Sequence, residues 1–351
     1  MCFGAGKALT NFVSLFPALH IETKIDCIVD NNSNKTGCDF IVNDTAIKVI
    51  SFQELLGLDY DKTVILITSQ YYVDIYNQLK CEDKSKDYIC YIYRFIIDES
   101  HPYLWKTNPA PASLRRTKTP LIPKKIHYCW FGKKPIPEQN KKYMESWKKY
   151  CPDYEIIEWN EDNYDFSHNK YARAAYENKM WAFVSDMVRL DVIYQYGGIY
   201  LDTDVQLLKS PDDLLYQEGF LGTFYAGEVN TGLGFGAQKG NPLIKEMLEQ
   251  YEKYEFLYDK DTKSLPLCVD YQTEYLKSKG YIIGGGYQNI DGVSIYAEEI
   301  LENVCFDTGR VVASDNTVAV HHSDASWRDD NDRKEQTRRY EFWKQHFDNR
   351  E

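Results

Sequence analysis

Residues 182–205, AFVSDMVRLDVIYQYGGIYLDTDV, decide the fold of this chain. Up to Tyr196 the apolar residues recur at the spacing of a helix, and Gly197 and Gly198 fall where a helix C-terminus is expected. From Ile199 to Val205 apolar and polar residues alternate, which is the pattern of a strand. The stretch therefore predicts a helix, a two-glycine stop and a strand that ends in paired aspartates.

The paired aspartates predict a metal site. Asp202 and Asp204 are two residues apart, so in a strand their carboxylates project from the same face. Two adjacent carboxylates repel unless a cation lies between them, and hard oxygen ligands suit Mg²⁺ or Mn²⁺. Asp-x-Asp pairs are also common in solvated turns. Here, however, the pair ends an apolar strand, where a carboxylate is costly to bury unless it is paired or metal-bound. We therefore expect Mn²⁺ or Mg²⁺ as the cofactor.

A second polar pair lies in the preceding helix. Asp186 and Arg189 are three residues apart and so share a helical face. Such a pair is often a surface ion pair of little energetic weight. Next to a metal site it can instead hold the polar groups of a ligand.

Four motifs in order resemble one enzyme family. Ser185-Asp186-x-x-Arg189 and the following run from Tyr196 to Asp204 resemble the sugar-binding Asp-x-Asp region of glycosyltransferase family 32. That family includes yeast-type mannosyltransferases and many bacterial capsular polysaccharide enzymes, and large clostridial glucosylating toxins carry a similar pattern. The resemblance extends to 122–132 (IPKKIHYCWFG), 230–237 (NTGLGFGA) and 319–327 (AVHHSDASW). It covers roughly residues 121–330 and implies a GT-A-type nucleotide-sugar transferase domain in an α/β fold.

The resemblance implies roles for the metal-binding residues. Asp204 is expected to ligate the metal directly, and Asp202 to contact it through water while binding ribose or sugar hydroxyls. His321 is the expected remaining ligand, with His322 as the alternative because neighbours in a strand face opposite ways. A histidine at either position can also be an ordinary hydrogen-bonded surface residue.

The resemblance also implies roles in substrate binding. Asp186 and Arg189 are expected to hold hydroxyls of the donor sugar, and with Asp202 and Asp204 we count Arg189 among the catalytic residues. Trp130 would border the base, although a core tryptophan is the alternative. The full predicted substrate-binding set is Trp130, Asp186, Arg189, Asn230, His322, Ser326 and Trp327, the last two donating hydrogen bonds to the departing phosphate.

The implied function is a metal-dependent, retaining glycosyltransferase. It would move a hexose from a nucleotide-diphosphate sugar, a UDP-sugar being favoured, to a saccharide or lipid-linked saccharide acceptor in bacterial capsule or surface polysaccharide synthesis. Retention by double displacement needs a carboxylate nucleophile, and none is evident, so front-face return is preferred. Two alternatives stay open: an Asp-x-Asp phosphohydrolase with Asp202 as the nucleophile, and a non-catalytic nucleotide-sugar binding protein.

Residues 1–98 predict a small Rossmann-like α/β module. Short apolar runs alternate with helical stretches, and Gly4 and Gly6 lie where a phosphate-binding turn is expected, with Asp30 as the candidate ribose ligand. Leu9 replaces the third glycine of the fingerprint, and most of a first strand is expected to be lacking because so little precedes Phe3. A structural or partner-docking role is therefore favoured over NAD binding. Residues 99–120 read as a linker and 121–351 as the transferase domain, in which the alternation of strands and helices predicts a mostly parallel sheet.

Composition limits the partners. The chain of 351 residues has a net charge of −12, which disfavours nucleic acid. Residues 113–150 carry eleven basic residues against Glu138 and Glu145, a local +9 that could meet an anionic membrane or could be a solvated helix face. The nine scattered cysteines indicate reduced thiols, and neither a transmembrane helix nor a signal peptide is expected. We expect a cytoplasmic protein, with the inner face of the membrane as a place of peripheral contact.

Overall fold

The chain forms two units, which we describe separately from a computed structural model. The structure describes residues 1–16, 24–42, 45–58, 63–98, 108–224, 227–256, 266–302, 304, 311, 313–324 and 330–347. One unit comprises residues 1–101, 307–309 and 330–351, and the other 102–306 and 310–329. Among the described helices none is both long enough and apolar enough to cross a bilayer.

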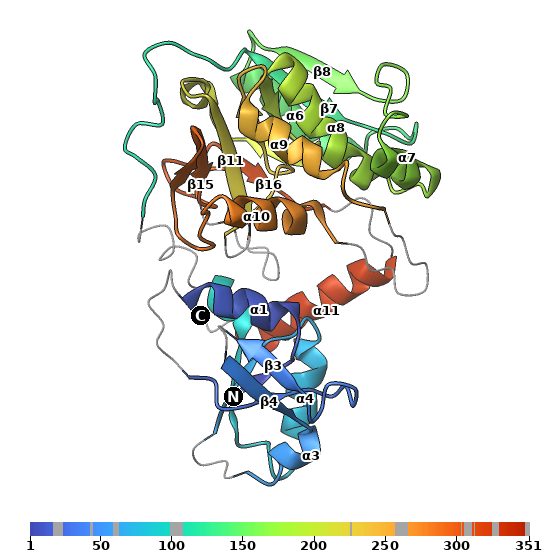
Figure 1. Cartoon of the computed structure of the whole chain (residues 1–351), viewed down its shortest axis with the longest axis vertical. Coiled ribbons are helices and arrows are strands. Elements are labelled where there is room, and N and C mark those ends of the chain that lie inside the picture. Colours follow the sequence, from blue (N-terminus) through green and yellow to red (C-terminus); the bar gives the residue numbers. More distant parts are fainter. Residues whose placement is uncertain are drawn as a thin grey trace. The chain divides into compact units, whose positions relative to one another are not determined.

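The N-terminal unit is a Rossmann-like sheet with helices on both faces (Figure 1). Its strands are β1 (Cys2–Phe3), β2 (Ile28–Val29), β3 (Asp39–Val42), β4 (Thr45–Ile50), β5 (Val64–Ile67) and β6 (Ile89–Ile92). They lie in the order β3-β4-β2-β1-β5-β6, and every pair is parallel except β3–β4. The parallel strands thus follow the 3-2-1-4-5 order of doubly wound folds, which confirms the predicted Rossmann-like module.

Helices cover the two faces of this sheet with separate cores. They are α1 (Lys7–Ser14), α3 (Phe52–Leu55), α4 (Tyr72–Cys81) and α11 (Asp330–His346). Leu9 and Val13 of α1 pack with Cys2, Ile28 and Val49 on one face. The other core includes Phe3, Val29 and Tyr72 together with Phe342 and Trp343 of α11.

The position of α11 corrects the predicted domain boundary. Residues 330–351 were expected to end the transferase domain, but they cluster with the N-terminal unit. Phe342 and Trp343 are each only 6% exposed within that core, and Arg338 forms an ion pair with Asp74 of α4. The chain therefore leaves the N-terminal unit, forms the transferase unit and returns to complete the first core.

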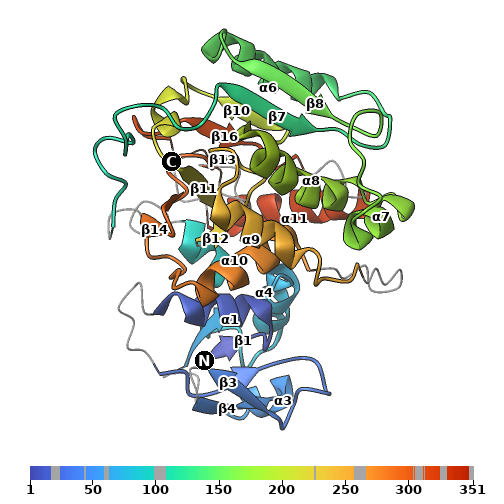
Figure 2. The same cartoon turned by 45° about the horizontal axis from the view of Figure 1, so that its top comes forward.

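The transferase unit is built on a mixed sheet (Figure 2). Its strands run in the order β14-β15-β11-β13-β9-β7-β8, with β12 added beside β11. Their bounds are β7 (Lys125–Cys129), β8 (Glu155–Trp159), β9 (Gly198–Tyr200), β11 (Gly219–Phe224), β12 (Glu228–Val229), β13 (Phe235–Ala237), β14 (Gln288–Ile290) and β15 (Val293–Tyr296). Among the described strands of this sheet, only the pairs β7–β8, β7–β9 and β11–β15 are parallel. The prediction of a mostly parallel sheet is therefore wrong, because β13 enters antiparallel to both β9 and β11.

The helices of this unit and one extra ribbon complete it. The helices are α6 (Glu138–Tyr150), α7 (Lys170–Glu177), α8 (Trp181–Tyr196), α9 (Pro242–Gln250) and α10 (Cys268–Ser278). The antiparallel ribbon pairs β10 (Val205–Leu207) with β16 (Ala319–His321). Residues 108–120, part of the expected linker, lie along this unit: the amides of Arg116 and Thr117 both donate to Tyr216 O at 2.8 Å.

Candidate active site

Helix α8 ends where the sequence predicts, and the two glycines explain why. Gly197 has φ +66° and its amide donates to Ile193 O at 2.8 Å, which closes the last turn. A Cβ on Gly198 would lie 2.9 Å from His127 Nε2, so only glycine lets β9 pack directly against β7. His127 accepts the Trp159 Nε1 hydrogen at Nδ1, so its Nε2–H donates to Gly197 O. Burial lowers the pKa of His127 to about 4, which keeps this structural imidazole neutral.

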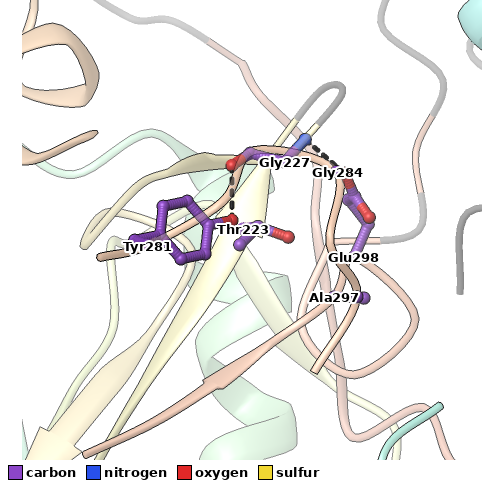
Figure 3. Close-up of a pocket in the computed structure, with 7 residues that line it drawn as sticks. Thr223, Gly227, Tyr281, Gly284, Ala297 and Glu298 are labelled. Carbon is purple, nitrogen blue, oxygen red and sulfur yellow. Dashed lines mark hydrogen bonds between the residues drawn. The ribbon is translucent and has the colours of Figure 1, made fainter. Parts of the chain in front are cut away.

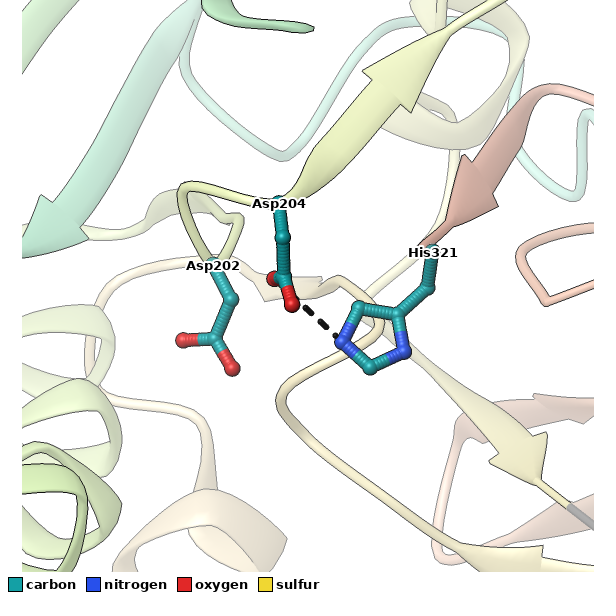
Figure 4. Close-up of side chains that lie close together, drawn as sticks. All are labelled: Asp202, Asp204 and His321. Carbon is teal, nitrogen blue, oxygen red and sulfur yellow. Dashed lines mark ion pairs between the residues drawn. The ribbon is translucent and has the colours of Figure 1, made fainter. Parts of the chain in front are cut away.

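The paired aspartates do not lie in a strand, contrary to the prediction. Strand β9 ends at Tyr200, and residues 201–204 form a turn in which Val205 N donates to Asp202 O at 3.0 Å. The next strand, β10, begins at Val205. The turn still presents both carboxylates toward one point, so the predicted proximity of Asp202 and Asp204 holds although its predicted cause does not (Figure 4).

The β10–β16 ribbon brings His321 to the aspartates. Val205 is paired with His321, and His322 N donates to Asp204 O at 3.0 Å. His321 Nε2 then lies 3.4 Å from Asp204 Oδ1 (Figure 4). Ligand atoms of Asp202, Asp204 and His321 all lie within 4.8 Å of one another. Two carboxylates and one imidazole are a donor set that a divalent cation such as Mn²⁺ fits.

His322 points elsewhere. Its ring stacks on Tyr143 with centroids 3.9 Å apart, and its Nε2 lies 3.0 Å from Gln206 Oε1. Of the two candidate histidines, the structure places only His321 in the metal group. The predicted contact of His322 with substrate stays a prediction.

Electrostatics hold His321 between two carboxylates. Desolvation opposes a charge on its ring, but Asp204 and Glu302 outweigh that effect and raise the pKa of His321 well above its usual range. Asp204 is also held by Asp324 N, which donates to Oδ2 at 3.0 Å. A proton on His321 therefore competes with a metal ion for the same position.

The Asp186–Arg189 pair is buried and reaches the aspartates. Arg189 Nη2 donates to Asp186 Oδ1 at 2.6 Å, with 4% and 8% of the two side chains exposed. Arg189 Nη1 lies 3.7 Å from Asp202 Oδ2. Burial raises the pKa of Asp186 to about 6, although Arg189 opposes the shift. The alternative of a solvated surface ion pair is thereby excluded.

Asn230 belongs to the same cluster. Its Oδ1 accepts the Gly232 amide at 2.7 Å, and a Cβ on Gly232 would touch Asp202, Arg189 and Asn230. Strand β12 and helix α10 fix this loop: Gln272 Oε1 accepts from Thr231 N at 3.2 Å, and Gln272 Nε2 donates to Thr231 Oγ1 at 2.9 Å. The structure thus brings Asp186, Arg189, Asn230 and Asp202 together, and their roles in substrate binding stay predictions.

Of the other predicted substrate-binding residues, Trp130 lies in the described part of the chain. Trp130 packs against the transferase core and donates Nε1–H to Lys134 O at 2.5 Å, so its role at the base stays a prediction. Ser326 and Trp327 lie outside the described residues.

Three residues at the site were not predicted from the sequence. The Tyr200 hydroxyl donates to Asp202 Oδ1 at 2.8 Å, and its ring lies 5.1 Å from the Arg189 guanidinium carbon. Cys268 Sγ lies 4.0 Å from Asn230 Oδ1. Glu302 Oε2 lies 3.3 Å from His321 Nδ1. Tyr200 lies within the Asp-x-Asp motif, whereas nothing in the sequence around Cys268 or Glu302 indicates a site.

A small cavity lies elsewhere in the same unit, beside the β11–β12 connection (Figure 3). Its lining includes Thr223, Gly227, Tyr281 and Glu298, and Tyr281 OH donates to Gly227 O at 2.6 Å. Its volume, counted as the space that the centre of a water molecule can occupy, is about 10 Å³, close to the minimum for one water molecule. This space is too small for a sugar.

Comparison with known proteins decides the family. Residues 137–221, which include Asp186, Arg189 and the paired aspartates, match the family described as "Glycosyltransferase sugar-binding region containing DXD motif". The uncharacterized glycosyltransferase L373 of Acanthamoeba polyphaga mimivirus is 32% identical over 173 residues, 45% of this chain and 67% of that protein. The chain belongs to this glycosyltransferase family. Its strands and helices form the α/β fold that the sequence predicts.

Other proteins match over a smaller share of their own length or only loosely in structure. Inositol phosphoceramide mannosyltransferase 3 of Schizosaccharomyces pombe is 30% identical over 146 residues, 39% of this glycosyltransferase and 39% of the yeast protein. The match thus spans about two fifths of the yeast enzyme's length. The solved structure of PaToxG Glycosyltransferase covers 53% of this chain and 80% of its own at 24% identity, with a TM-score of 0.37. That superposition is too loose to define the fold by itself.

Proposed function

We propose that this glycosyltransferase is a metal-dependent, retaining hexosyltransferase. Its donor is a nucleotide-diphosphate sugar, a UDP-sugar being favoured, and its acceptor is a saccharide or a lipid-linked saccharide. The observation that carries the proposal is the convergence of Asp202, Asp204 and His321 beside the buried Asp186–Arg189 pair. One group can hold a cation, and the other can hold sugar hydroxyls.

The two groups divide the work on the donor. Asp202, Asp204 and His321 would hold Mn²⁺ or Mg²⁺, which supplies positive charge to the departing diphosphate. Asp186 and Arg189 are fixed by burial and by each other, so they can accept from and donate to donor hydroxyls with little reorganisation. Tyr200 and Asn230 lie beside these groups: the Tyr200 hydroxyl donates to Asp202, and Asn230 Oδ1 accepts from the Gly232 amide.

The biological setting is part of the proposal. The resemblance to capsular polysaccharide enzymes supports a role in bacterial capsule or surface polysaccharide synthesis, at the cytoplasmic face of the membrane. The yeast relative is named for transfer of mannose to inositol phosphoceramide, which supports an acceptor that carries a lipid. Mannose accordingly joins glucose and galactose among the hexoses to be tested.

A ligand screen followed by turnover tests the proposal. The melting temperature of the full chain is measured with UDP-glucose, UDP-galactose and GDP-mannose, with and without Mn²⁺. Ligand at a hundred times its Kd stabilises the chain by about 2.7 kcal/mol, so the true donor should raise the melting temperature only with metal. The anomeric configuration of the product, read by NMR, should match that of the donor sugar.

Asp204→Asn is the decisive variant. Its kcat should fall by roughly 10²-fold or more, because a ligand of the ion that stabilises the leaving group is lost. Asp213→Asn is the matched control, since Asp213 is exposed and Arg115 is its one ion-pair partner among the described residues. Full activity in EDTA would rule out the metal-dependent reaction. Tight donor binding without turnover on any acceptor would favour a non-catalytic binding protein.

A further inference from the structure

A buried carboxylate lies behind the metal-site histidine. Glu302 is 2% exposed, and its Oε2 lies 3.3 Å from His321 Nδ1. Apart from this imidazole, no donor in the described part of the chain contacts Oε2. A carboxylate is costly to bury without a partner. We therefore expect Glu302 to act through His321.

The backbone holds the two residues together from both sides. Glu302 N donates to Glu298 O at 3.0 Å, which closes the turn that follows β15. Ile300 O in this turn accepts from both Val318 N and Ala319 N, at 2.9 and 3.2 Å. Val318 directly precedes β16 and Ala319 is its first residue, and this strand carries His321. The approach of Glu302 to His321 is therefore a property of the fold and not of two mobile side chains.

The two ring nitrogens of His321 face different partners. Nε2 faces Asp204 Oδ1, on the side of the paired aspartates. Nδ1 faces Glu302 Oε2 and also the Ser323 hydroxyl, whose Oγ lies 3.1 Å away. A carboxylate can only accept, whereas a hydroxyl can donate or accept. A hydrogen on Nδ1 therefore satisfies Glu302 and leaves the Nε2 lone pair free to bind a cation.

We propose that Glu302 is a positioning residue for the metal site, fixing His321 in the tautomer and orientation that present Nε2 to the cation. Metal-binding histidines usually donate their other ring N–H to a carboxylate or a carbonyl, which orients the ring and makes it a better ligand. The proposal rests on the function proposed above. It adds a residue 98 positions away from Asp204, outside every motif in the sequence.

Metal affinity tests the proposal directly. Mn²⁺ binding to the full chain, with and without UDP, is measured by calorimetry and by the Mn²⁺ electron paramagnetic resonance spectrum. Glu302→Gln keeps the shape of the side chain but removes its charge, and it should weaken Mn²⁺ binding by about 10- to 100-fold. Without metal, the Glu302→Gln variant should melt at about the same temperature as the native chain. This result would separate a role in metal binding from a role in folding.

Two neighbouring variants serve as controls. Glu299 is three residues nearer β15, and its carboxylate accepts from Ser314 Oγ and Asn316 Nδ2 and does not contact His321. Glu299→Gln should therefore leave Mn²⁺ affinity unchanged. Ser323→Ala should weaken Mn²⁺ binding less than Glu302→Gln does. The reverse order would mean that the hydroxyl orients the ring, and the role of Glu302 would be disproved.

If Glu302→Gln fails to fold, a spectrum of the native chain still tests the proposal. In the ¹⁵N spectrum of histidine-labelled protein with Mg²⁺, His321 should carry hydrogen on Nδ1, with His321→Gln used for assignment. Hydrogen on Nε2 would overturn the proposal. Native Mn²⁺ binding that Glu302→Gln leaves intact would sink this inference alone. Absence of Mn²⁺ binding by the native chain, even with UDP, would remove the metal-dependent function and this inference together.

Discussion

Gly232 lies so close to Asp202 that a Cβ on residue 232 would come within 2.6 Å of Asp202 Oδ2. This Cβ would also lie 3.0 Å from both Arg189 Nη1 and Asn230 Oδ1. The backbone of Gly232 also takes part, because its carbonyl accepts from Asp202 N at 3.3 Å. The loop after β12 and the aspartate turn thus meet at a residue that has no room for a side chain.

Gly232→Ala should therefore damage donor binding while leaving the fold intact. The added methyl must push Asp202, Arg189 or Asn230 by several tenths of an ångström, and a misplacement approaching 1 Å can cost about 10²-fold in rate. We expect kcat/KM for the nucleotide sugar to fall at least roughly tenfold. Gly6→Ala is the control, since a Cβ there meets nothing within 4 Å. Native kcat/KM in the Gly232→Ala variant would show that the cluster tolerates displacement.

The ionisation of Asp186 should set the acid limb of the pH profile. Burial raises the pKa of Asp186 to about 6 despite the opposing charge of Arg189. Only the carboxylate can accept from both Arg189 and a donor hydroxyl, so kcat/KM should decline below about pH 6. Asp186→Asn should lower the plateau and abolish this limb. A profile of the native enzyme that stays flat down to pH 5 would contradict the assignment.

The same shift predicts the pH dependence of folding stability. The folded pKa of Asp186 lies above its reference value of 3.8, so the folded state binds the proton more tightly than the unfolded state does. This group therefore adds stability to the native chain as pH falls from about 6 to 4. Comparing the melting temperatures of the native chain and Asp186→Asn at each pH isolates the effect. As the pH falls through that window, the melting temperature of the native chain should rise relative to that of the variant. A constant difference would contradict the shift.

The local parts of the site were predictable from the sequence. Helix α8, its glycine stop and the proximity of Asp202 to Asp204 follow from spacing within 24 residues. The alternation after Ile199, however, fits a turn leading into a strand as well as one continuous strand, and the structure has the turn. The role of His321 came from the family pattern, because spacing alone could not choose between two adjacent histidines.

What depended on distant pairing was not predictable. The antiparallel entry of β13 and the return of α11 to the N-terminal core are decided by which apolar faces meet. Phe342 and Trp343 are apolar residues in an otherwise mostly polar helix, and their identity does not indicate which core receives them. Glu302 lies in a turn with no motif, and only the pairing of Ile300 with the segment before β16 brings it to His321.

The N-terminal unit should not bind NAD tightly. Asp30, which occupies the position of a ribose ligand, already accepts from Ala5 N at 2.8 Å and pairs with Lys35 Nζ at 3.2 Å. Lys35 Nζ also donates to Ala5 O at 2.6 Å, beside the glycine turn. Leu9, in place of the third glycine, is a fully buried residue of α1. Asp30 and the glycine turn are therefore already bonded to groups of this chain, which leaves Asp30 less able to bind a ribose.

Calorimetric titration of the full chain with NAD and NADH measures this. The full chain is needed because Phe342 and Trp343 complete the core of the N-terminal unit. We expect a Kd weaker than about 10 μM, a binding free energy no better than roughly −7 kcal/mol. A tighter Kd would mean that Asp30 exchanges its internal partners for ribose.

The basic segment 113–150 is partly neutralised in the folded chain. Five of its eleven bases form ion pairs, and these are Arg115, Lys124, Lys125, Lys133 and Lys141. Lys142 and Lys149 are exposed on α6, two turns apart on one face, and Lys148 is exposed beside them. No ion pair joins these three to a carboxylate within the described residues. Any attraction to an anionic membrane should therefore come mainly from α6.

We expect the chain to sediment with phosphatidylglycerol vesicles at low salt and to be released as salt rises, because surface attraction is screened within a Debye length. Each lysine near an anionic surface contributes about 1 kcal/mol, so replacing Lys142, Lys148 and Lys149 with Gln should weaken binding by roughly 10²-fold. Replacing the exposed Lys239, Lys245 and Lys253 makes the same change in net charge outside this segment and should have a smaller effect. Equal losses in the two triple variants would mean that net charge alone drives the binding. No sedimentation of the native chain at low salt would end the proposal of peripheral membrane contact.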